Sequence, residues 1–421
     1  MIMSKEAGKI YAEAAKIWNP DRVATFKKFG FEMVMGKRQG SYFEDLDGHE
    51  YINMHSNGGV FNLGHRNPEI RQALIDGMDV VDAGNHYFPS RYKNELNEKL
   101  LAASPENMKY VFTLNGGGEA IDAAVKFARR ATKRQRIISL ACAFHGGTGI
   151  AMQAGNPKLA EFFNMTPDPK LYTHIAYNNL EQLEMVLKKN DTAAVLIETI
   201  PATAGFPMPI ENYHREVQRL AHQYGALYIA DEVQTGMMRS GQMWCCCKFK
   251  AVPDMIVTGK GLSGGYYPMS AVIMNDEAAS WMKEDGFAHT SSFNGTELGC
   301  IVASKVLDIL KRPAVKQNID QLTEFFQLNL AKLQQKHREF LVEVRQCGVI
   351  MGLKTAHPLG GQALMVALIK NGVWAVMADF DKSVLQFKPN LLMDQITAKK
   401  VISRLDQALS EAQQMVSTPS L

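Results

Sequence analysis

A lysine set among small residues is the feature of this sequence that most directly suggests chemistry. Lys260 lies in the stretch Thr258-Gly259-Lys260-Gly261-Leu262-Ser263-Gly264-Gly265. Small neighbours leave the amine accessible to a planar ligand, since glycine allows close approach to the backbone. A lysine on a glycine-rich turn is more often simply solvated, so the surroundings of Lys260 decide which interpretation holds.

An acidic pair and a glycine run are the next candidates. Asp231 and Glu232 close the apolar run 226–230, and a carboxylate at this position serves either an active site or the cap of the next element. Asn115-Gly116-Gly117-Gly118-Glu119 stands between an expected strand and an expected helix, where free amides and the helix dipole favour a phosphate. The run lacks the third glycine of a dinucleotide fingerprint. Phosphate binding and a plain tight turn both remain open for it.

The elements that position these residues follow from the apolar pattern. Strands are expected at 110–114, 136–141, 193–198, 226–230 and 255–258. Helices are expected between them, one with Ile121, Ala124, Val125 and Ala128 on a single face and another at 212–224, stopped by Gly225. This alternation predicts an α/β fold with a mostly parallel sheet flanked by helices. In such sheets ligands bind beyond the carboxyl ends of the strands.

Four features fall at those strand ends: the Gly116–Gly118 turn, Glu198, Asp231 and Lys260. Beyond residue 312 the pattern changes to long helices at 315–337, 361–371 and 395–415 around short strands at 348–354 and 384–388. We therefore expect a large domain over residues 61–311 and a small α+β domain over 312–421. Because residues 42–53 resemble a hairpin, we expect the N-terminal segment, 1–60, to pack with the small domain.

The order and spacing of the motifs resemble the class III (omega-type) aminotransferases, which are pyridoxal-phosphate (PLP) enzymes of fold type I. The resemblance covers almost the whole chain. The segments that carry it are Leu46-Asp47-Gly48, Gly64-His65-Arg66-Asn67-Pro68, Gly118-Glu119-Ala120, Lys126-Phe127-Ala128-Arg129, Phe144-His145-Gly146, Asp231-Glu232-Val233-Gln234-Thr235-Gly236, Arg239-Ser240-Gly241, Pro253-Asp254, Lys260-Gly261-Leu262 and His289-Thr290-Ser291-Ser292-Phe293.

The resemblance implies a catalytic role for two residues. Lys260 carries PLP as a Schiff base and then acts as the base that moves the proton on Cα. Asp231 pairs with the pyridine nitrogen, which keeps the ring an electron sink.

The resemblance also implies the residues that hold the cofactor. Gly117 and Gly118 give amides to the phosphate, and Ser292 matches a threonine that reaches the phosphate from a partner subunit. A homodimer with shared sites follows from that match. The remaining residues surround the ring: Phe144 and Val233 on its two faces, Gln234 at its phenolic oxygen and Glu198 beside it.

Two departures from the family pattern concern the substrate. Many members bind the glutamate α-carboxylate with an arginine where this chain has Gln386, and mask that arginine with a glutamate where it has Thr203. The Asn-Pro that follows the Ser292 loop in the family is replaced by Thr296-Glu297. Drift or local misalignment is one interpretation; different handling of carboxylates is the other. Lys388 stands two residues after Gln386, on the same side of an extended strand, and could replace the arginine.

We therefore predict transamination by a ping-pong route, from an amine or amino-acid donor to a keto or aldehyde acceptor. The alternatives on the same cofactor are a racemase or epimerase, an aminomutase and a lyase. A binding protein without activity is disfavoured because Lys260 and Asp231 are both present. A dinucleotide-dependent oxidoreductase is disfavoured by the missing third glycine.

The composition of the chain excludes some classes of binding partner and indicates a cellular location. The net charge of +3 on 421 residues is spread without a basic block, so we expect neither nucleic acid nor a membrane surface as a partner. No run approaches the roughly 18–20 apolar residues of a membrane span, and the N-terminus does not resemble a signal peptide. Cys245, Cys246 and Cys247 are contiguous, a poor arrangement for one tetrahedral metal. We expect no metal site and a cytoplasmic protein.

Overall fold

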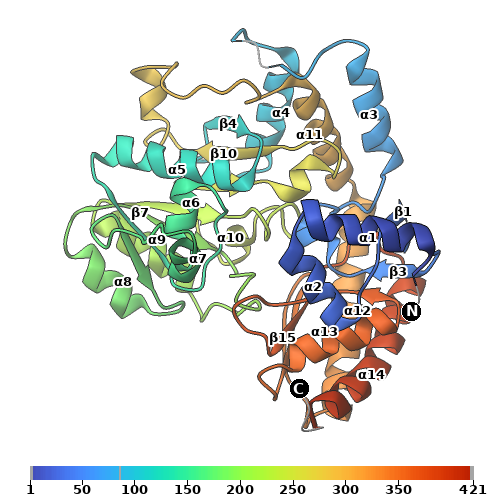
Figure 1. Cartoon of the computed structure of the whole chain (residues 1–421). Coiled ribbons are helices and arrows are strands. Elements are labelled where there is room, and N and C mark those ends of the chain that lie inside the picture. Colours follow the sequence, from blue (N-terminus) through green and yellow to red (C-terminus); the bar gives the residue numbers. More distant parts are fainter. Residues whose placement is uncertain (1–2, 85–86, 418–421) are drawn as a thin grey trace.

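The computed structural model describes residues 3–84 and 87–417. Its largest sheet has seven strands and is surrounded by helices (Figure 1). Its strands are β4 (Tyr110–Leu114), β5 (Arg136–Leu140), β6 (Tyr172–Ile175), β7 (Thr192–Glu198), β8 (Leu227–Asp231), β9 (Met255–Thr258) and β10 (Ser270–Met274). The spatial order is β4-β10-β9-β8-β7-β5-β6. Only β10 runs antiparallel to its neighbours, so the carboxyl ends of the other six strands meet at one edge.

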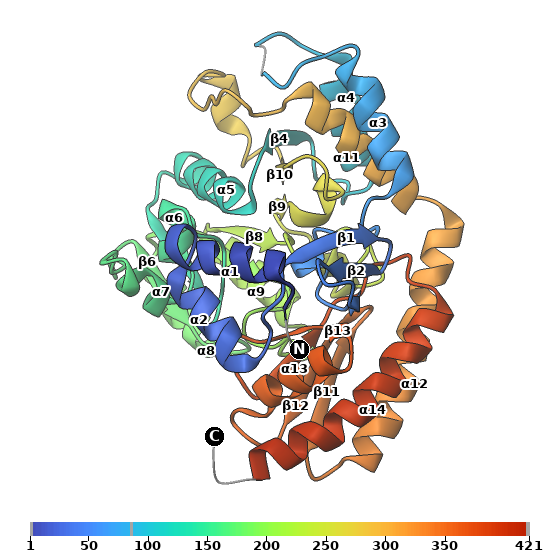
Figure 2. The same ribbon diagram turned by 45° about the vertical axis from the view of Figure 1, so that its right-hand side comes forward.

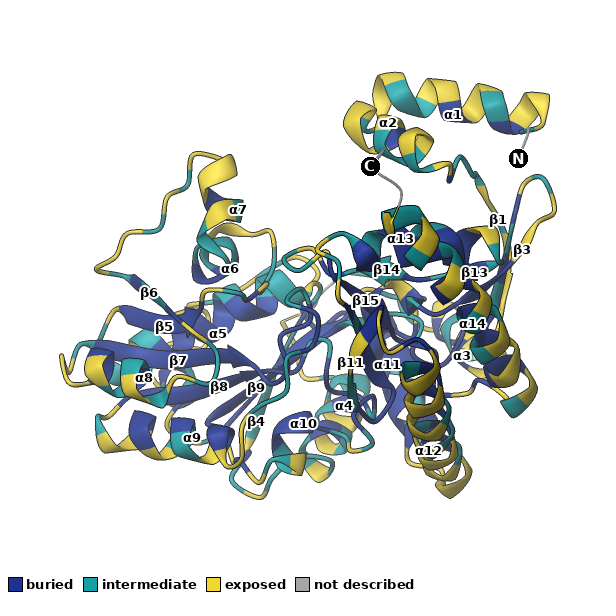
Figure 3. Ribbon diagram, turned by 90° about the horizontal axis from the view of Figure 1, so that it is seen from below, coloured by how far each residue is buried: buried dark blue, intermediate teal, exposed yellow. Residues whose placement is uncertain are grey.

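Both faces of this sheet are buried, which explains the continuous apolar runs in the sequence. Every residue of β7 is buried (Figure 3). Alternate residues of the strand belong to different cores. Val195 and Ile197 belong to one apolar cluster, and Ala194 and Leu196 to the other. Period-two alternation thus distributes one strand between two layers of helices.

Helices cover both faces of the seven-stranded sheet and form the two outer layers of this domain. On one face, α5 (Gly117–Thr132) buries the predicted stripe of Ile121, Ala124, Val125 and Ala128. The opposite face is covered by helices that include α8 (Leu180–Leu187) and α9 (Tyr213–Gln223). Other helices of this part are α3 (Pro68–Met78), α4 (Arg91–Ala102), α6 (Gly149–Ala154), α7 (Pro157–Phe162), α10 (Cys245–Lys248) and α11 (Glu297–Leu310), with short 3₁₀ turns η1 (Ser56–Gly59), η2 (Lys260–Ser263) and η3 (Ser280–Lys283).

Two four-stranded sheets lie beside the large one, together with the C-terminal helices (Figure 2). The first has the order β1-β2-β3-β13 and the second, all antiparallel, β11-β12-β15-β14. The strands are β1 (Met35–Gln39), β2 (Tyr42–Asp45), β3 (Glu50–Asn53), β11 (Leu341–Cys347), β12 (Ile350–Thr355), β13 (Val373–Trp374), β14 (Val376–Met377) and β15 (Val384–Phe387). The helices are α1 (Lys5–Ile17), α2 (Pro20–Phe29), α12 (Pro313–Lys336), α13 (Gly360–Lys370) and α14 (Gln395–Ser417). None of the helices within the described residues is long and apolar enough to cross a membrane.

The chain ends share one of these sheets. β13 pairs in parallel with β3, so Val373 lies opposite Ile52. This pairing supports the prediction that the N-terminal segment packs with the C-terminal part. The boundaries at residues 60 and 311 remain predictions.

The predicted strands and helices are found with small shifts at their ends, and one strand start is wrong. Strand 348–354 begins later, at Ile350, because Gly348 has a φ of +60° in the tight turn after β11. β11 and β10 are absent from the predicted pattern, as are α1 and α2. The hairpin at 42–53 is confirmed as β2 and β3.

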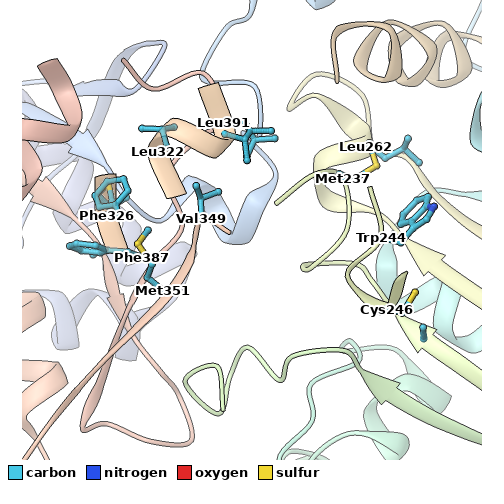
Figure 4. Packing of buried hydrophobic residues seen from close by; sticks show 14 of the residues in the cluster. Met237, Trp244, Cys246, Leu262, Leu322, Phe326, Val349, Met351, Phe387 and Leu391 are labelled. Carbon is cyan, nitrogen blue, oxygen red and sulfur yellow. The ribbon is translucent and has the colours of Figure 1, made fainter. Parts of the chain in front are cut away.

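β15 alternates in the same way as the large strands. Phe387 is fully buried and points toward Phe326 and Met351 (Figure 4). Its neighbours Gln386 and Lys388 therefore project to the opposite side. The apolar face of this strand fixes where those two polar side chains lie.

Candidate active site

The glycine turn, the acidic strand end and the lysine meet at one edge of the large sheet. β4 leads into Gly117 at the start of α5, β8 ends at Asp231, and Lys260 follows β9 by two residues. A Cβ atom placed on Gly117 would lie 2.9 Å from Val233 Cγ1, and one on Gly259 would lie 3.7 Å from the Gly117 Cα. Any side chain on Gly117 would therefore collide with Val233 and separate these segments.

Lys260 is held in a constrained turn beside a second glycine segment. Its φ is +42°, in the left-handed region that non-glycine residues seldom adopt. A Cβ on Gly58 would lie 3.3 Å from Lys260 Cε, so η1 forms one wall beside the amine. Burial lowers the pKa of Lys260, an effect opposed by the charges of Asp231 and Glu198. Among the described residues, the amine has no hydrogen-bond acceptor.

Asp231 is buried and both of its oxygens accept a hydrogen bond. Oδ2 lies 2.7 Å from Nδ1 of His145, and Oδ1 accepts the Val233 backbone N–H at 3.0 Å. The carboxylate is thereby fixed in one orientation at the end of β8. Such a group can hold a proton on a nitrogen of a bound ring.

Glu198 occupies the corresponding end of β7, directly beside Asp231 in the sheet register. Its oxygens accept the backbone N–H groups of Phe144 at 2.8 Å and Ala202 at 3.1 Å. Burial and repulsion from Asp231 raise the pKa of Glu198 to about 7. Glu198 therefore anchors two loops around the site and titrates near neutral pH.

The other predicted cofactor residues differ in how they are placed. Phe144 exposes a large part of its ring despite its apolar character, and Gln234 has a buried side-chain oxygen with no hydrogen-bond partner within the described chain. Gly117 and Gly118 begin α5, where their N–H groups have no carbonyl partner in the same helix. Ser292 is exposed on the loop between η3 and α11 and makes no hydrogen bond to the other candidates in the part of the chain described.

The three predicted substrate residues do come together. Gln386 Nε2 donates to the carbonyl oxygen of Ala202 at 2.5 Å, next to Thr203. The ammonium of Lys388 donates to Gln386 Oε1, which confirms that the two side chains lie on one side. Thr203 Oγ1 is buried without a hydrogen-bond partner in the described residues.

Two histidines of the site are absent from the predicted set. His145 belongs to the Phe144-His145-Gly146 motif of the family resemblance. Its contact with Asp231 shows that this motif also positions the carboxylate. His55 is half-buried, and its buried Nδ1 has no partner among described atoms. Burial, followed by the charges of Lys388, Lys260 and Arg239, lowers the pKa of His55. No local pattern in the sequence marks His55.

The neighbouring Glu232 has a structural role rather than a place in the site. Its oxygens accept the hydroxyls of Thr199 and Thr235 and the backbone N–H groups of Cys245 and Cys246. These bonds fix α10, whose first two cysteines are buried in different apolar clusters. The contiguous cysteines are therefore packing residues beside a buried carboxylate.

The unsatisfied groups of this site fit PLP. Free amides at the start of a 16-residue helix suit a phosphate, and Phe144 offers an uncovered ring for stacking on a planar group. The buried Gln234 oxygen lacks a partner in the described residues. The Lys260 amine, beside Gly58, donates to no acceptor in the same part of the chain. Bound PLP would supply the missing partner of each of these groups.

This combination of a parallel-rich sheet, a lysine after β9 and a carboxylate after β8 defines a PLP enzyme of fold type I. A family model described as class-III aminotransferase matches residues 26–409, and the chain therefore belongs to that family. The predicted family, fold class, cofactor and reaction are thus confirmed.

Relatives named for this reaction match over nearly the whole chain. An uncharacterized aminotransferase of Archaeoglobus fulgidus is 40% identical, covering 94% of this chain and 92% of its own. A [LysW]-aminoadipate semialdehyde/glutamate semialdehyde transaminase of Sulfolobus acidocaldarius is 31% identical, covering 86% and 91%. The solved taurine:2-oxoglutarate aminotransferase of Bifidobacterium kashiwanohense, in complex with PLP and glutamate, superposes with a TM-score of 0.85 at 24% identity, covering 91% and 93%.

Proposed function

We propose that Lys260 carries PLP as a Schiff base and is the proton-transferring base of this aminotransferase. The observation that carries the proposal is its amine, set among the fixed carboxylates of Asp231 and Glu198 and without an acceptor in the described chain. Burial lowers the pKa of this amine, which favours the neutral form that a nucleophile and a base require.

The other residues bind and orient around that amine. Bound PLP supplies a carbonyl carbon that joins amines and a ring that accepts electrons from the substrate Cα. Asp231 holds the proton on the ring nitrogen, and His145 keeps the Asp231 carboxylate in place. Gly117 and Gly118 donate backbone N–H groups to the phosphate. Lys260 takes the proton from the substrate Cα at its Nζ.

Around the ring we propose three further contacts. Phe144 stacks on one face and Val233 packs on the other; Val233 already lies against Gly117 at the start of α5. Gln234 hydrogen-bonds the phenolic oxygen, a role supported by its buried side-chain oxygen, which has no partner in the described residues. Glu198 stays beside the cofactor and sets the position of Phe144 through the backbone bond at 2.8 Å.

A second copy of this chain completes the site in our proposal. Ser292 is exposed, and so are the aromatic side chains of Phe287 and Phe293 on the same loop. Tyr87 and Phe88 are exposed as well, and Tyr87 lies 6.1 Å from Phe287 between ring centroids. Exposed apolar groups that gather in this way are typical of a subunit interface. The homodimer then brings Ser292 of each subunit to the phosphate in the other.

The substrates proposed are an amine or amino acid as donor and a keto acid or aldehyde as acceptor. The names of the relatives include amino-acid semialdehydes and 2-oxoglutarate, which supports this range. Because these relatives are aminotransferases, the racemase, aminomutase and lyase alternatives are disfavoured. We also propose a cytoplasmic location, supported by six unpaired cysteine thiols.

The test of the proposal is chemical trapping. Borohydride reduces an imine between the cofactor and a lysine, so the wild-type protein should retain a label that maps to the Lys260 peptide. Lys260→Ala should bind no label, retain the folded far-ultraviolet spectrum and have no turnover. A label on any other lysine would refute the assignment.

A further inference from the structure

Lys388 is a buried lysine whose amine lacks a carboxylate partner in the described chain. It follows β15 and is only 2% exposed. Its ammonium donates to the neutral amide oxygen of Gln386 and lies 5.7 Å from the ring centroid of Phe206. A buried ammonium is costly unless an anion compensates it, and an amide oxygen and an aromatic ring supply only partial compensation.

The charges near Lys388 increase this cost. Burial, and then the charges of Lys260 and Arg239, lower the pKa of Lys388, with Asp379 acting weakly in the opposite direction. Arg239 is itself 1% exposed and donates only to the neutral oxygens of Pro389 and Asn62, at 2.9 and 2.6 Å. Two buried basic side chains therefore lie near Lys260, and the hydrogen bonds of both go to neutral oxygens.

One short segment connects Lys388 with the reactive lysine. The backbone N–H of Lys388 donates to the carbonyl oxygen of Met54 at 2.6 Å. The residues that follow Met54 form η1, and Gly58 in η1 lies against Lys260 Cε. His55 lies between Met54 and η1 in the sequence. After burial, the charges of Lys388 and Lys260 are the next causes that lower its pKa. Lys388 is thus placed where a part of the substrate other than its reacting amine would lie.

We propose that Lys388 binds a carboxylate of the amino donor and of the corresponding oxo acid, so that this site selects carboxylate-bearing substrates over simple amines. The proposal rests on Lys260 being the reactive amine. Gln386 holds the ammonium until the substrate arrives, and its own Nε2 is anchored on the carbonyl of Ala202. A substrate carboxylate replaces the amide oxygen as acceptor and supplies the missing anion. Lys388 offers a point charge to one oxygen rather than the two-pronged contact of an arginine.

The kinetic test compares donors that differ by one carboxylate. Suitable pairs are leucine with isopentylamine, phenylalanine with phenethylamine, and 4-aminobutyrate with propylamine. For each pair that the wild-type holoenzyme accepts, the ratio of kcat/KM values measures the preference for the carboxylate. Lys388→Gln removes the charge but keeps a donor for Gln386, and should reduce this ratio roughly tenfold to a hundredfold, the range of one charged hydrogen bond.

A control variant tests whether the loss of any nearby lysine charge, rather than that of Lys388, changes the ratio. Lys354→Met removes a lysine from the neighbouring strand β12, where its amine lies 3.5 Å from Asp381. It should leave every ratio unchanged. If Lys388→Gln does not bind cofactor, Lys388→Met takes its place. An unchanged ratio in the Lys388 variants for every accepted pair would overturn the proposal.

Binding without turnover gives an independent measurement. Propanoate, 4-methylpentanoate and succinate, each beside its neutral amide, are titrated calorimetrically into the holoenzyme. The wild type should bind at least one carboxylate more tightly than the matching amide, and Lys388→Gln should lose that preference. A wild type without any such preference, or a variant that keeps it, would contradict the role of Lys388. If borohydride labels a lysine other than Lys260 while the preference still depends on Lys388, the assignment of Lys260 fails and the carboxylate site stands.

Discussion

His145 Nδ1 lies 2.7 Å from Asp231 Oδ2, and both side chains are buried at the carboxyl end of β8. The second oxygen of Asp231 accepts the Val233 backbone N–H. The carboxylate therefore has no freedom to rotate away from the place where a ring nitrogen is proposed to bind. A carboxylate fixed in advance stabilises charge without reorganising during the reaction.

Asp231→Asn should impair turnover far more than it impairs cofactor binding. A neutral amide cannot hold a proton on the ring nitrogen, and the loss should resemble the removal of a preorganised electrostatic group, about 2.7–4 kcal/mol of barrier. The measurement is kcat beside the cofactor content of the purified protein. Equal kcat values in variant and wild type would rule out this role for Asp231.

His145→Leu should reduce kcat through Asp231 rather than through a contact with the substrate. His145→Asn is the matched control, because its amide places a donor close to the position of Nδ1. We expect the leucine variant to show an altered pH dependence of the bound cofactor's visible absorbance, and the asparagine variant to resemble the wild type. If both variants lose activity equally with unchanged absorbance, His145 is only a packing residue.

The sequence predicts those parts of this site that depend on neighbours along the chain. The strand ends at Glu198 and Asp231, the turn at Gly117 and the position of Lys260 all follow from local apolar runs and glycines. The bond between His145 and Asp231 joins residues 86 positions apart, so no window of sequence contains it. The same is true of Gln386 and Ala202, which are 184 positions apart.

β10 and β11 are two of the strands that the sequence pattern did not predict. β10 (Ser270–Met274) is a short apolar run like the parallel strands, and only its pairing with β4 and β9 shows that it is antiparallel. β11 has an exposed and partly exposed middle, so it lacks the continuous apolar run that marks the large sheet. The role proposed for Ser292 requires a second subunit, so it rests on the family resemblance rather than on a local pattern of this chain.

Glu198 should make the stability of the cofactor-free protein depend on pH. Burial and Asp231 raise its pKa from 4.5 to about 7, so the folded state binds more protons than the unfolded state between these values. Its contribution to stability is fully present below about pH 4.5 and is lost as the pH rises through about 7. Relative to Glu198→Gln, the wild type should lose on the order of a few kcal/mol over this window.

Urea unfolding at several pH values from 5 to 8 measures this difference. The glutamine variant carries a constant penalty, because its amide cannot accept both the Phe144 and Ala202 N–H groups, and this penalty does not change with pH. Parallel stability profiles for the two proteins would show that Glu198 titrates as it does in the unfolded chain.

Subunit complementation tests the shared site proposed for Ser292. Lys260→Ala and Ser292→Trp should each be inactive as homodimers. In a mixed dimer one site combines both defects and the other has neither, so exchange of subunits should restore roughly a quarter of wild-type activity in an equal mixture. Absence of recovery after exchange has been demonstrated would place Ser292 outside the partner's site.

L-Glutamate should not be the best amino donor of this enzyme. Gln386 offers neither the charge nor the two-pronged geometry with which an arginine binds a carboxylate, and it is already bonded to Ala202 and Lys388. Thr203 cannot take the place of a masking glutamate, and its hydroxyl has no partner among described residues. Lys388 is a single point charge, whereas glutamate brings two carboxylates into the site.

Half-reaction kinetics with L-glutamate beside amines and neutral amino acids measure the preference through the rate at which the pyridoxamine form accumulates. We expect a neutral amino acid to exceed glutamate in kcat/KM, and Lys388→Ala to weaken that donor further. Glutamate as the best donor, with Lys388→Ala leaving it so, would refute both the preference and the use of Lys388.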